Sequence, residues 1–364
     1  MSDESVLTDQ AQYAVLVRAG ELAGRELTGV DLGGAECPGA DLRGSALLEV
    51  TLAGATLVKA DLSSAALQDC NLTGANLSHV TATRAKILSS LLQGAVGRRA
   101  NLDDAVLSEC DFSRADFRRA SLARAVVSNC LASESRLRGA VLAHATLTGA
   151  VLSRAVVSCS NFQKALMTAV LLEHAAAAGT DFTGAEIRDS NLTRITAPGS
   201  VFVNAVLATV RAEYADLSRS DFSGATVSAS IFDRSTWWRS TLNGGGFAGC
   251  SFEFADLRSI RAAGSDFSGV SFAGADLRGA HFNRCVLREA DFYWADLTDC
   301  KLVDCDTVGA RLPEPVRVAY GPRNAAPPHV VRIPLYRVAA TEEEYVRMIS
   351  DGLDGDSEPQ DTRP

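Results

Sequence analysis

The sequence has few of the features that direct a protein into a membrane, a secretory route or a disulfide scaffold. No part of its 364 residues approaches a run of about 18 apolar positions, so an ordinary membrane-spanning helix is excluded. The first residues, Met-Ser-Asp-Glu-Ser, lack the basic start and apolar stretch of a secretion signal, and we expect a cytoplasmic protein. The nine cysteines are sparse and include no C-x-x-C pair, which argues against a disulfide framework.

Recognisable catalytic patterns are also lacking. The five histidines are scattered, and no nucleophile elbow, phosphate-binding loop or metal-spaced cluster of ligands occurs. We therefore predict a protein that is not an enzyme and holds no cofactor and no metal. The net charge of -9 further argues against direct binding to nucleic acid or to an anionic membrane.

What the sequence does have is a period of five residues. Segments such as Ala40 to Gly44, Ala75 to His79 and Ala275 to Gly279 read A-(D/N)-L-x-x. From Leu27 to Leu312, the residues whose numbers end in 2 or 7 are mostly Leu, Phe, Ile, Val or Met, and those two places earlier are mostly Ala, Ser, Cys, Thr or Gly. Neither a helical nor a strand period produces this pattern, whereas a chain that turns a corner every five residues does.

Each pentapeptide then forms one side of a square coil. The large residue and the small residue point into a narrow interior, and the other three face water. Four sides make a coil of about 20 residues, which gives about 14 coils and a rod on the order of 70 Å long at the usual strand spacing. A repeat of this kind escapes the usual size limit of a single core, because each coil contacts only its neighbours.

This pattern resembles that of the pentapeptide repeat proteins, over about four fifths of the chain. The resemblance implies an all-β solenoid, a right-handed quadrilateral β-helix with short helical and extended caps. We assign residues 1–26 to an N-terminal capping helix, 27–312 to the β-helix, 313–340 to an extended proline-rich segment, 341–351 to a C-terminal helix and 352–364 to a disordered tail.

A period of 20 predicts that central residues 20 apart stack upon one another. Phe162, Phe182, Phe202 and Phe222 would form one aromatic column, and Phe232, Phe252, Phe272 and Phe292 another on the opposite side. Seven of the nine cysteines occupy the small inward position, where we interpret them as buried reduced thiols. The stretch Ala82 to Arg99 matches the repeat least well, so a loop or short helix within it is an alternative. At Trp237 the large indole predicts local widening.

Outward residues can be assigned to the four sides by their number within the coil. One side carries a basic cluster on three successive coils: Arg98, Arg99, Arg118, Arg119, Arg136 and Arg138. Guanidinium groups suit carboxylate and phosphate, so this cluster is a candidate site for an acidic partner, the alternative being an ordinary solvated face.

A second side carries acidic residues together with exposed valine and leucine. Its candidate partner-binding residues are Glu49, Asp69, Glu109, Glu186, Asp189 and Asp266. Here too an ordinary solvated face is the alternative to a surface for a protein partner.

The family resemblance suggests a concrete function. Some pentapeptide repeat proteins protect DNA gyrase from quinolones or peptide toxins by resembling duplex DNA in width, shape and negative charge. The resemblance therefore implies a DNA mimic that binds gyrase or another type II topoisomerase and gives antibiotic resistance. It also implies a homodimer formed through the C-terminal helix, and a monomer in which this helix is only a cap is the alternative. The competing hypothesis is a protein-interaction scaffold without DNA mimicry, because the basic cluster would repel a DNA-binding groove.

Overall fold

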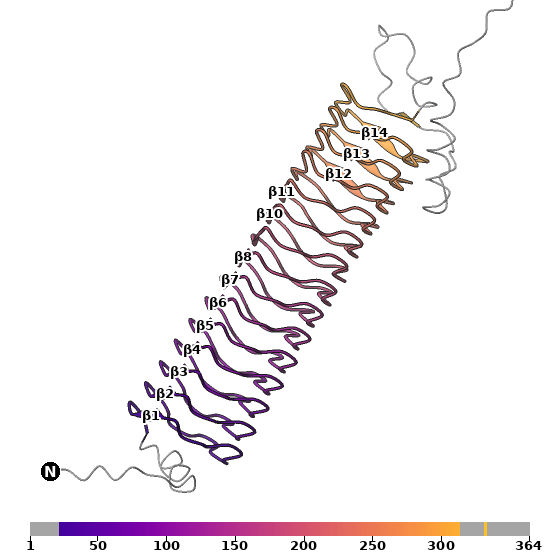
Figure 1. Ribbon diagram of the computed structural model, residues 1–364. Helices are drawn as coiled ribbons and strands as arrows, with labels where there is room; N and C mark the ends of the chain where they lie inside the picture. The colour runs from indigo at the N-terminus through magenta and orange to yellow at the C-terminus, as the bar shows by residue number, and fades with distance from the viewer. Residues whose placement is uncertain (1–21, 314–330, 333–364) are drawn as a thin grey trace, which may run out of the picture.

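The computed structural model describes residues 22–313 and 331–332 of the chain. Residues 22–313 form a single rod of stacked coils, and the chain runs from one end of the rod to the other (Figure 1). Of the predicted N-terminal capping helix, residues 1–26, only residues 22–26 are described, and of the predicted C-terminal segments, residues 313–364, only residues 313 and 331–332 are described. No helix occurs within the described part of the chain, and hence none long and apolar enough to cross a membrane.

Fourteen short strands mark the coils, and the first eleven form one parallel sheet along one side of the rod. Each strand pairs with the next in a register of 20 residues, as in Leu27 with Leu47 and Leu47 with Leu67. The strands of this sheet are β1 Glu26–Thr28, β2 Ala46–Leu48, β3 Ala66–Gln68, β4 Lys86–Leu88, β5 Val106–Ser108, β6 Val126–Ser128, β7 Thr146–Thr148, β8 Leu166–Thr168, β9 Glu186–Arg188, β10 Val206–Ala208 and β11 Thr226–Ser228.

After β11 the sheet moves to a neighbouring side of the rod. Strands β12 Arg261–Ala263, β13 His281–Asn283 and β14 Lys301–Val303 stack on the side that follows the corner at Ser259 and Ile260. The coil register is unbroken, because Thr226 bridges Gly246 and Gly246 bridges Asp266. The two-residue strand β15 Val331–Arg332 pairs antiparallel with β14 and so continues this second sheet beyond the last coil.

Each corner of the coil is a residue in the left-handed region. Every residue whose number ends in 4 or 9 from Gly24 to Gly309 has a positive φ, including Thr209 at 56° and Trp294 at 61°. Glycine reaches this region freely, whereas a β-branched or bulky side chain is strained there. The next coil offsets the strain: the Thr209 amide donates to the Ser228 carbonyl at 3.0 Å, and nearly every corner repeats this bond.

The interior follows the predicted pattern of large and small residues. The predicted aromatic columns are confirmed, with ring centroids 5.3, 4.7 and 4.4 Å apart along the column from Phe162 to Phe222. Those from Phe232 to Phe292 are 5.1, 5.7 and 5.0 Å apart. Each ring therefore packs on the face of the ring in the next coil.

Trp237 connects the two columns. Its indole is fully buried and lies 4.6 Å from the Phe222 ring and 5.1 Å from the Phe232 ring. The indole Nε1 donates a hydrogen bond of 2.7 Å to the Ser235 hydroxyl, which satisfies its buried N–H. The aromatic column thus passes from one side of the shaft to the other through this single side chain.

The stretch from Ala82 to Arg99 remains within the coil. Strand β4 runs through it, and Leu91 and Val96 bridge Asp111 and Asp116 of the next coil. Gly97 replaces a large central residue because Phe117 stacks directly above it. A Cβ on Gly97 would lie only 2.3 Å from the Phe117 ring, so the missing side chain makes room for the phenyl group.

One place in the shaft is incompletely filled. A cavity of about 50 Å³ lies where Ala132 occupies a central position, and it is lined by Phe112, Phe117, Val127, Leu137 and ten other residues, Ala132 among them. The buried Ser135 hydroxyl beside it has no hydrogen-bond partner. A single polar group is too few to hold an ordered water, so the cavity is an apolar packing defect.

The described cysteines are free thiols, and those at small inward positions are buried apart from the half-buried Cys305. Burial in the apolar shaft raises the pKa of the Cys250 thiol to about 11. These cysteines therefore act as compact apolar fillers.

Candidate functional site: an arginine-lined hollow

Five of the six arginines predicted to form a basic cluster line one hollow on the rod. Arg98, Arg99, Arg118, Arg119 and Arg138 meet there with Ser78, His79, Gly139 and Cys159. The coils are held in register by backbone hydrogen bonds, in which the Arg99 amide donates to Arg118 and the Arg119 amide to Arg138, each at 3.1 Å. Arg99 and Arg119 occupy left-handed corners, so their side chains leave the rod at its edge.

Asp116 organises the hollow from beneath. Its carboxylate accepts two hydrogen bonds from Arg118, at 2.8 Å from Nε and 2.7 Å from Nη2, and one of 2.8 Å from Arg98 Nε. The Arg118 guanidinium and then that of Arg98 lower the pKa of Asp116 to about 2, against the opposing effect of burial. This carboxylate is buried and ionised, and it fixes two of the five guanidinium groups.

The other three arginines of the hollow have no acidic partner in the described part of the chain. No carboxylate there lies within 4 Å of Arg99, Arg119 or Arg138, although twelve such contacts of other arginines occur outside the hollow in the described part of the rod. The hollow therefore presents three unpaired guanidinium groups on successive coils, which suit a row of carboxylate or phosphate groups.

Arg136 is the member of the predicted cluster that lies apart. It is exposed and stacks on Asp116 in the backbone ladder, but it does not line the hollow. Asp116 is the member that the sequence reasoning missed. The segment Ala115 to Arg119 places an aspartate two residues before an arginine, and that spacing is the signal that was available.

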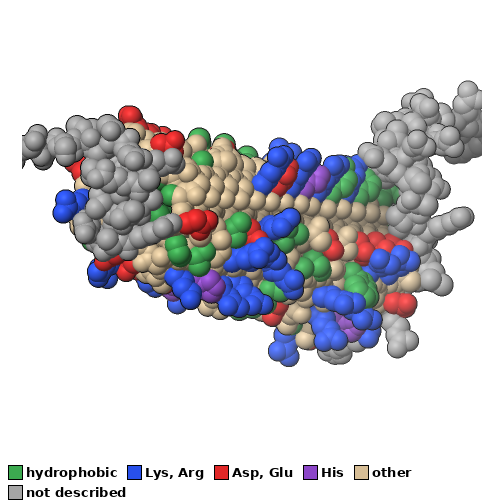
Figure 2. All heavy atoms as spheres, turned by 90° about the horizontal axis from the view of Figure 1, so that it is seen from below, with side chains coloured by type: hydrophobic (Ala, Val, Ile, Leu, Met, Phe, Trp, Pro, Cys, Tyr) green, Lys and Arg blue, Asp and Glu red, His purple; other side chains and the backbone are tan. Residues whose placement is uncertain are grey.

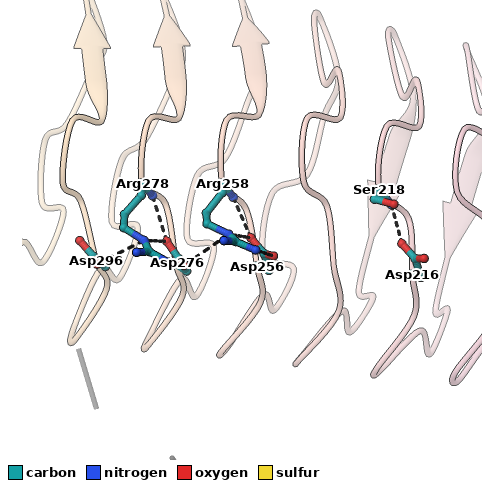
Figure 3. Close-up of polar contacts among 7 residues, drawn as sticks. All are labelled: Asp216, Ser218, Asp256, Arg258, Asp276, Arg278 and Asp296. Atoms are coloured by element: carbon teal, nitrogen blue, oxygen red, sulfur yellow. Dashed lines mark hydrogen bonds and ion pairs between the residues drawn. The ribbon is translucent and has the colours of Figure 1, made fainter. Parts of the chain in front are cut away.

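The same spacing produces a row of alternating aspartate and arginine side chains on the later coils of the rod. Arg258 pairs with Asp256 at 2.6 Å and reaches Asp276 at 3.6 Å, while Arg278 pairs with Asp276 at 2.5 Å and reaches Asp296 at 3.6 Å. Figure 3 shows these side chains alternating on successive coils. Arginines of this kind are occupied by their own carboxylates, in contrast to Arg99, Arg119 and Arg138.

The predicted acidic residues lie on one side but do not converge on one site. Glu49, Asp69, Glu109 and Asp189 occupy left-handed corners next to the long sheet. Glu186 lies in β9, and Asp266 lies on the same side of the rod beyond the end of that sheet. Glu186 is paired with Arg188 at 3.1 Å. Glu49 and Asp69 are on adjacent coils, whereas Glu109 and Asp189 are separated by 80 residues and hence by four coils.

Exposed apolar side chains accompany these acids. Val126 and Leu166 lie on the long sheet, with Leu91 and Leu131 across the corner from it. On the face shown in Figure 2, basic side chains gather in separate patches with acidic and apolar side chains between them. The rod therefore offers several small surfaces of mixed charge rather than one field of a single sign.

Within residues 22–313 and 331–332, no three His, Cys, Asp or Glu side chains lie close enough together to hold a metal ion. The arginine-lined hollow is open, and five guanidinium groups line it. Its arrangement is one that binds anions.

Comparison with known proteins identifies the repeat. The sequence profile described as "Pentapeptide repeats" matches the chain in eight copies, over residues 26–63, 60–96, 100–139, 135–173, 186–228 and 265–302. A comparison with curated protein sequences gives no significant match.

Solved structures of low sequence identity also match this chain. HetL, a pentapeptide repeat protein involved in heterocyst differentiation regulation from the cyanobacterium Nostoc sp. strain PCC 7120, is 20% identical over 70% of this chain and 85% of its own, with a TM-score of 0.22. Full-length QnrB1, a plasmid-mediated fluoroquinolone resistance protein, is 16% identical over 81% and 94%, with a TM-score of 0.19. The A-module of the mannuronan C-5 epimerase AlgE6 from Azotobacter vinelandii is 12% identical over 85% and 96%, with a TM-score of 0.34.

Proposed function

Because this chain belongs to the pentapeptide repeat family, we propose that it is a non-enzymatic interaction scaffold that binds an acidic segment of a partner protein in its arginine-lined hollow. The observation that carries the proposal is the row of three arginines, Arg99, Arg119 and Arg138, without acidic partners among the described residues. An extended partner segment running along the rod would place its carboxylates against successive coils, about 5 Å apart.

The ion pairs of Asp116 support this assignment. By accepting hydrogen bonds from Arg98 and Arg118, Asp116 offsets one of their two positive charges and holds both side chains in place. Preorganised donors lose less conformational entropy when a ligand binds, which favours a specific site over a loose cationic patch.

A defined acidic probe tests the proposal. A fluorescent peptide of ten glutamates should bind the purified protein, and changing Arg99, Arg119 and Arg138 together to Gln should weaken that binding at least about 10-fold, since charge-assisted hydrogen bonds are lost. Fluorescence anisotropy at two salt concentrations measures the affinity and its electrostatic share.

The matched control changes Arg43, Arg114 and Arg124 to Gln. These three arginines also lie on the rod, but each is paired with a carboxylate, at 2.6, 3.0 and 2.7 Å. Both triple variants lose the same formal charge, so the control should bind nearly as well as the wild type. Equal losses in the two variants would reduce the effect to net charge and refute a specific site.

A second candidate function is protection of DNA gyrase by DNA mimicry. Its support is the net charge of -9 of the whole chain and the adjacent acidic corners at Glu49 and Asp69, neither of which has a basic partner among the described residues. The extensive pairing of other carboxylates with arginine counts against it. A supercoiling assay with purified gyrase, with and without a quinolone, decides: charge reversal at Glu109, Glu186 and Asp189 should abolish a genuine effect, and an inert wild type at micromolar concentration ends the idea.

A further inference from the structure

A second cationic hollow lies near the other end of the rod, where the sheet has changed sides. It spans the corner before β12 and the outer faces of β12 and β13. Its lining consists of Arg219, Arg239, Thr241, Asn243, Ser259, Ile260, Arg261, Ala262, Ala263, Gly279, His281 and Asn283. No carboxylate is among them.

Two of its arginines are held by an aromatic ring. The guanidinium carbon of Arg219 lies 4.8 Å from the centroid of the Trp238 ring, and that of Arg239 lies 4.5 Å from it. The indole is therefore in contact with both cations, which restricts their guanidinium groups without neutralising them. No carboxylate of the described residues lies within 4 Å of either arginine.

Parallel pairing adds a second row of positive charge. Arg261, His281 and Lys301 stack on β12, β13 and β14 as direct neighbours in the ladder. Burial lowers the pKa of His281, and Lys301 and Arg261 lower it further, as expected of an imidazole surrounded by cations. These strands place the row beside the corner that bears Arg239, because Thr241 bridges Arg261.

Asp256, Asp276 and Asp296, on the side of the rod that precedes the corner, form the row of alternating side chains with Arg258 and Arg278 shown in Figure 3. Asp221, two residues after Arg219, accepts hydrogen bonds from Ser223. The lining of the hollow also includes the small residues Ser259, Gly279 and Ala263 and the amide side chains of Asn243 and Asn283.

We propose that this hollow binds a phosphate group carried by a phosphorylated ligand, held by Arg219, Arg239 and Arg261 with His281 and the asparagine amides as further donors. A single carboxylate carries one charge and two oxygens, which one arginine fork satisfies. A phosphate monoester carries nearly two charges and three strong acceptor oxygens, which matches three guanidinium groups and additional neutral donors. The site is separate from the arginine-lined hollow and does not depend on its function.

Isothermal titration calorimetry of the full chain tests the site. The probes are pyrophosphate, a short phosphoserine peptide, the same peptide unphosphorylated, and the peptide with glutamate in place of phosphoserine. We expect the phosphoserine peptide to bind at least about 10-fold more tightly than the glutamate form, because a lost charged hydrogen bond is worth about that factor. Tighter binding of pyrophosphate than of the peptide would identify a small phosphorylated compound as the ligand, and the reverse a phosphorylated protein.

Arg261→Gln should weaken binding of the preferred probe about 10-fold or more, for the same reason. The matched control is Arg258→Gln, which removes the same side chain three residues earlier but outside the hollow, where it pairs with Asp256. Thermal melts of both variants check that they fold. Equal affinity for phosphorylated and glutamate peptides, unchanged binding by Arg261→Gln, or an equal loss in Arg258→Gln would each overturn the proposal.

Discussion

At the scale of single residues, the features that decide function on this rod are pairs of charges two positions or one coil apart. An aspartate at the start of a side can form an ion pair with an arginine two residues later, because both side chains lie on the same face of the coil, as in Asp256 with Arg258. Arg99 and Arg119, at left-handed corners, have no acidic partner among the described residues, whereas Arg114 and Arg124, also at corners, pair with a carboxylate one coil away. An arginine therefore becomes a binding group where no carboxylate lies two positions before it or one coil away.

Asp116 gives a prediction at this scale. Its folded pKa of about 2 lies below the ordinary value of 3.8, so its ion pairs stabilise the protein above about pH 4 and are lost as the pH falls through the folded value. For a carboxylate whose side chain is 8% exposed, the shift corresponds to on the order of 2 kcal/mol at neutral pH.

The Asp116→Asn variant should therefore have a lower urea midpoint than the wild type at pH 7. Its midpoint should also change less than that of the wild type between pH 5 and pH 2.5, because one titrating group has been removed. Parallel pH dependence in the two proteins would show that Asp116 contributes no linked stability.

At the scale of the element, the unit of this fold is the coil, and its four central residues must fill a shaft of fixed width. The chain varies their sizes in compensating ways, as Gly97 beneath Phe117 shows. The coil around Ala132 is the exception, with a cavity of about 50 Å³. Filling such a space stabilises a protein, whereas enlarging a residue in a full coil causes overpacking.

Ala132→Leu should raise the urea midpoint, by an amount equivalent to about 1 to 2 kcal/mol for the added buried methyl groups. The comparison variant is Ala177→Leu, at a central alanine with no exposed surface and no cavity beside it. That change should lower the midpoint by the equivalent of about 1 to 3 kcal/mol. The same direction of change in both variants would contradict the packing account.

At the scale of the whole molecule, the rod is a one-dimensional stack whose two halves differ in composition. The coils before Phe162 have mostly leucine at central positions and contain the cavity, whereas later coils are joined by the stacked aromatic columns. In such a stack each coil interacts only with its neighbours, so the halves can unfold at different denaturant concentrations.

Two optical signals can separate these halves. All three tryptophans, Trp237, Trp238 and Trp294, lie in the last third of the described rod, so their fluorescence reports on that part, while circular dichroism reports on every coil. We expect the fluorescence midpoint in urea to lie above the circular dichroism midpoint. Coincident transitions would show that the rod unfolds as one cooperative unit.

The residue pattern alone determined a coil that turns every five positions around a narrow core, because one large and one small apolar residue recur in every pentapeptide, and the family resemblance supplied the form of a quadrilateral β-helix. It fixed the inward positions, the period of 20 and hence the stacking of Phe162 on Phe182. Gly97 looked like a break in the pattern, since its meaning depends on Phe117 one coil away.

Only the tertiary structure decided which outward residues work together. Outward positions face water and carry no packing constraint, so their side chains are free to pair within a side, across coils or not at all. For this reason the sequence did not show that Arg136 lies outside the hollow or that Asp116 binds Arg118. It also did not show that Arg261 and His281 line a second hollow with residues from a neighbouring side of the coil. The inward pattern also does not say which side of the coil carries the strands. The sheet moves to a neighbouring side after β11, although the register of 20 residues continues unchanged.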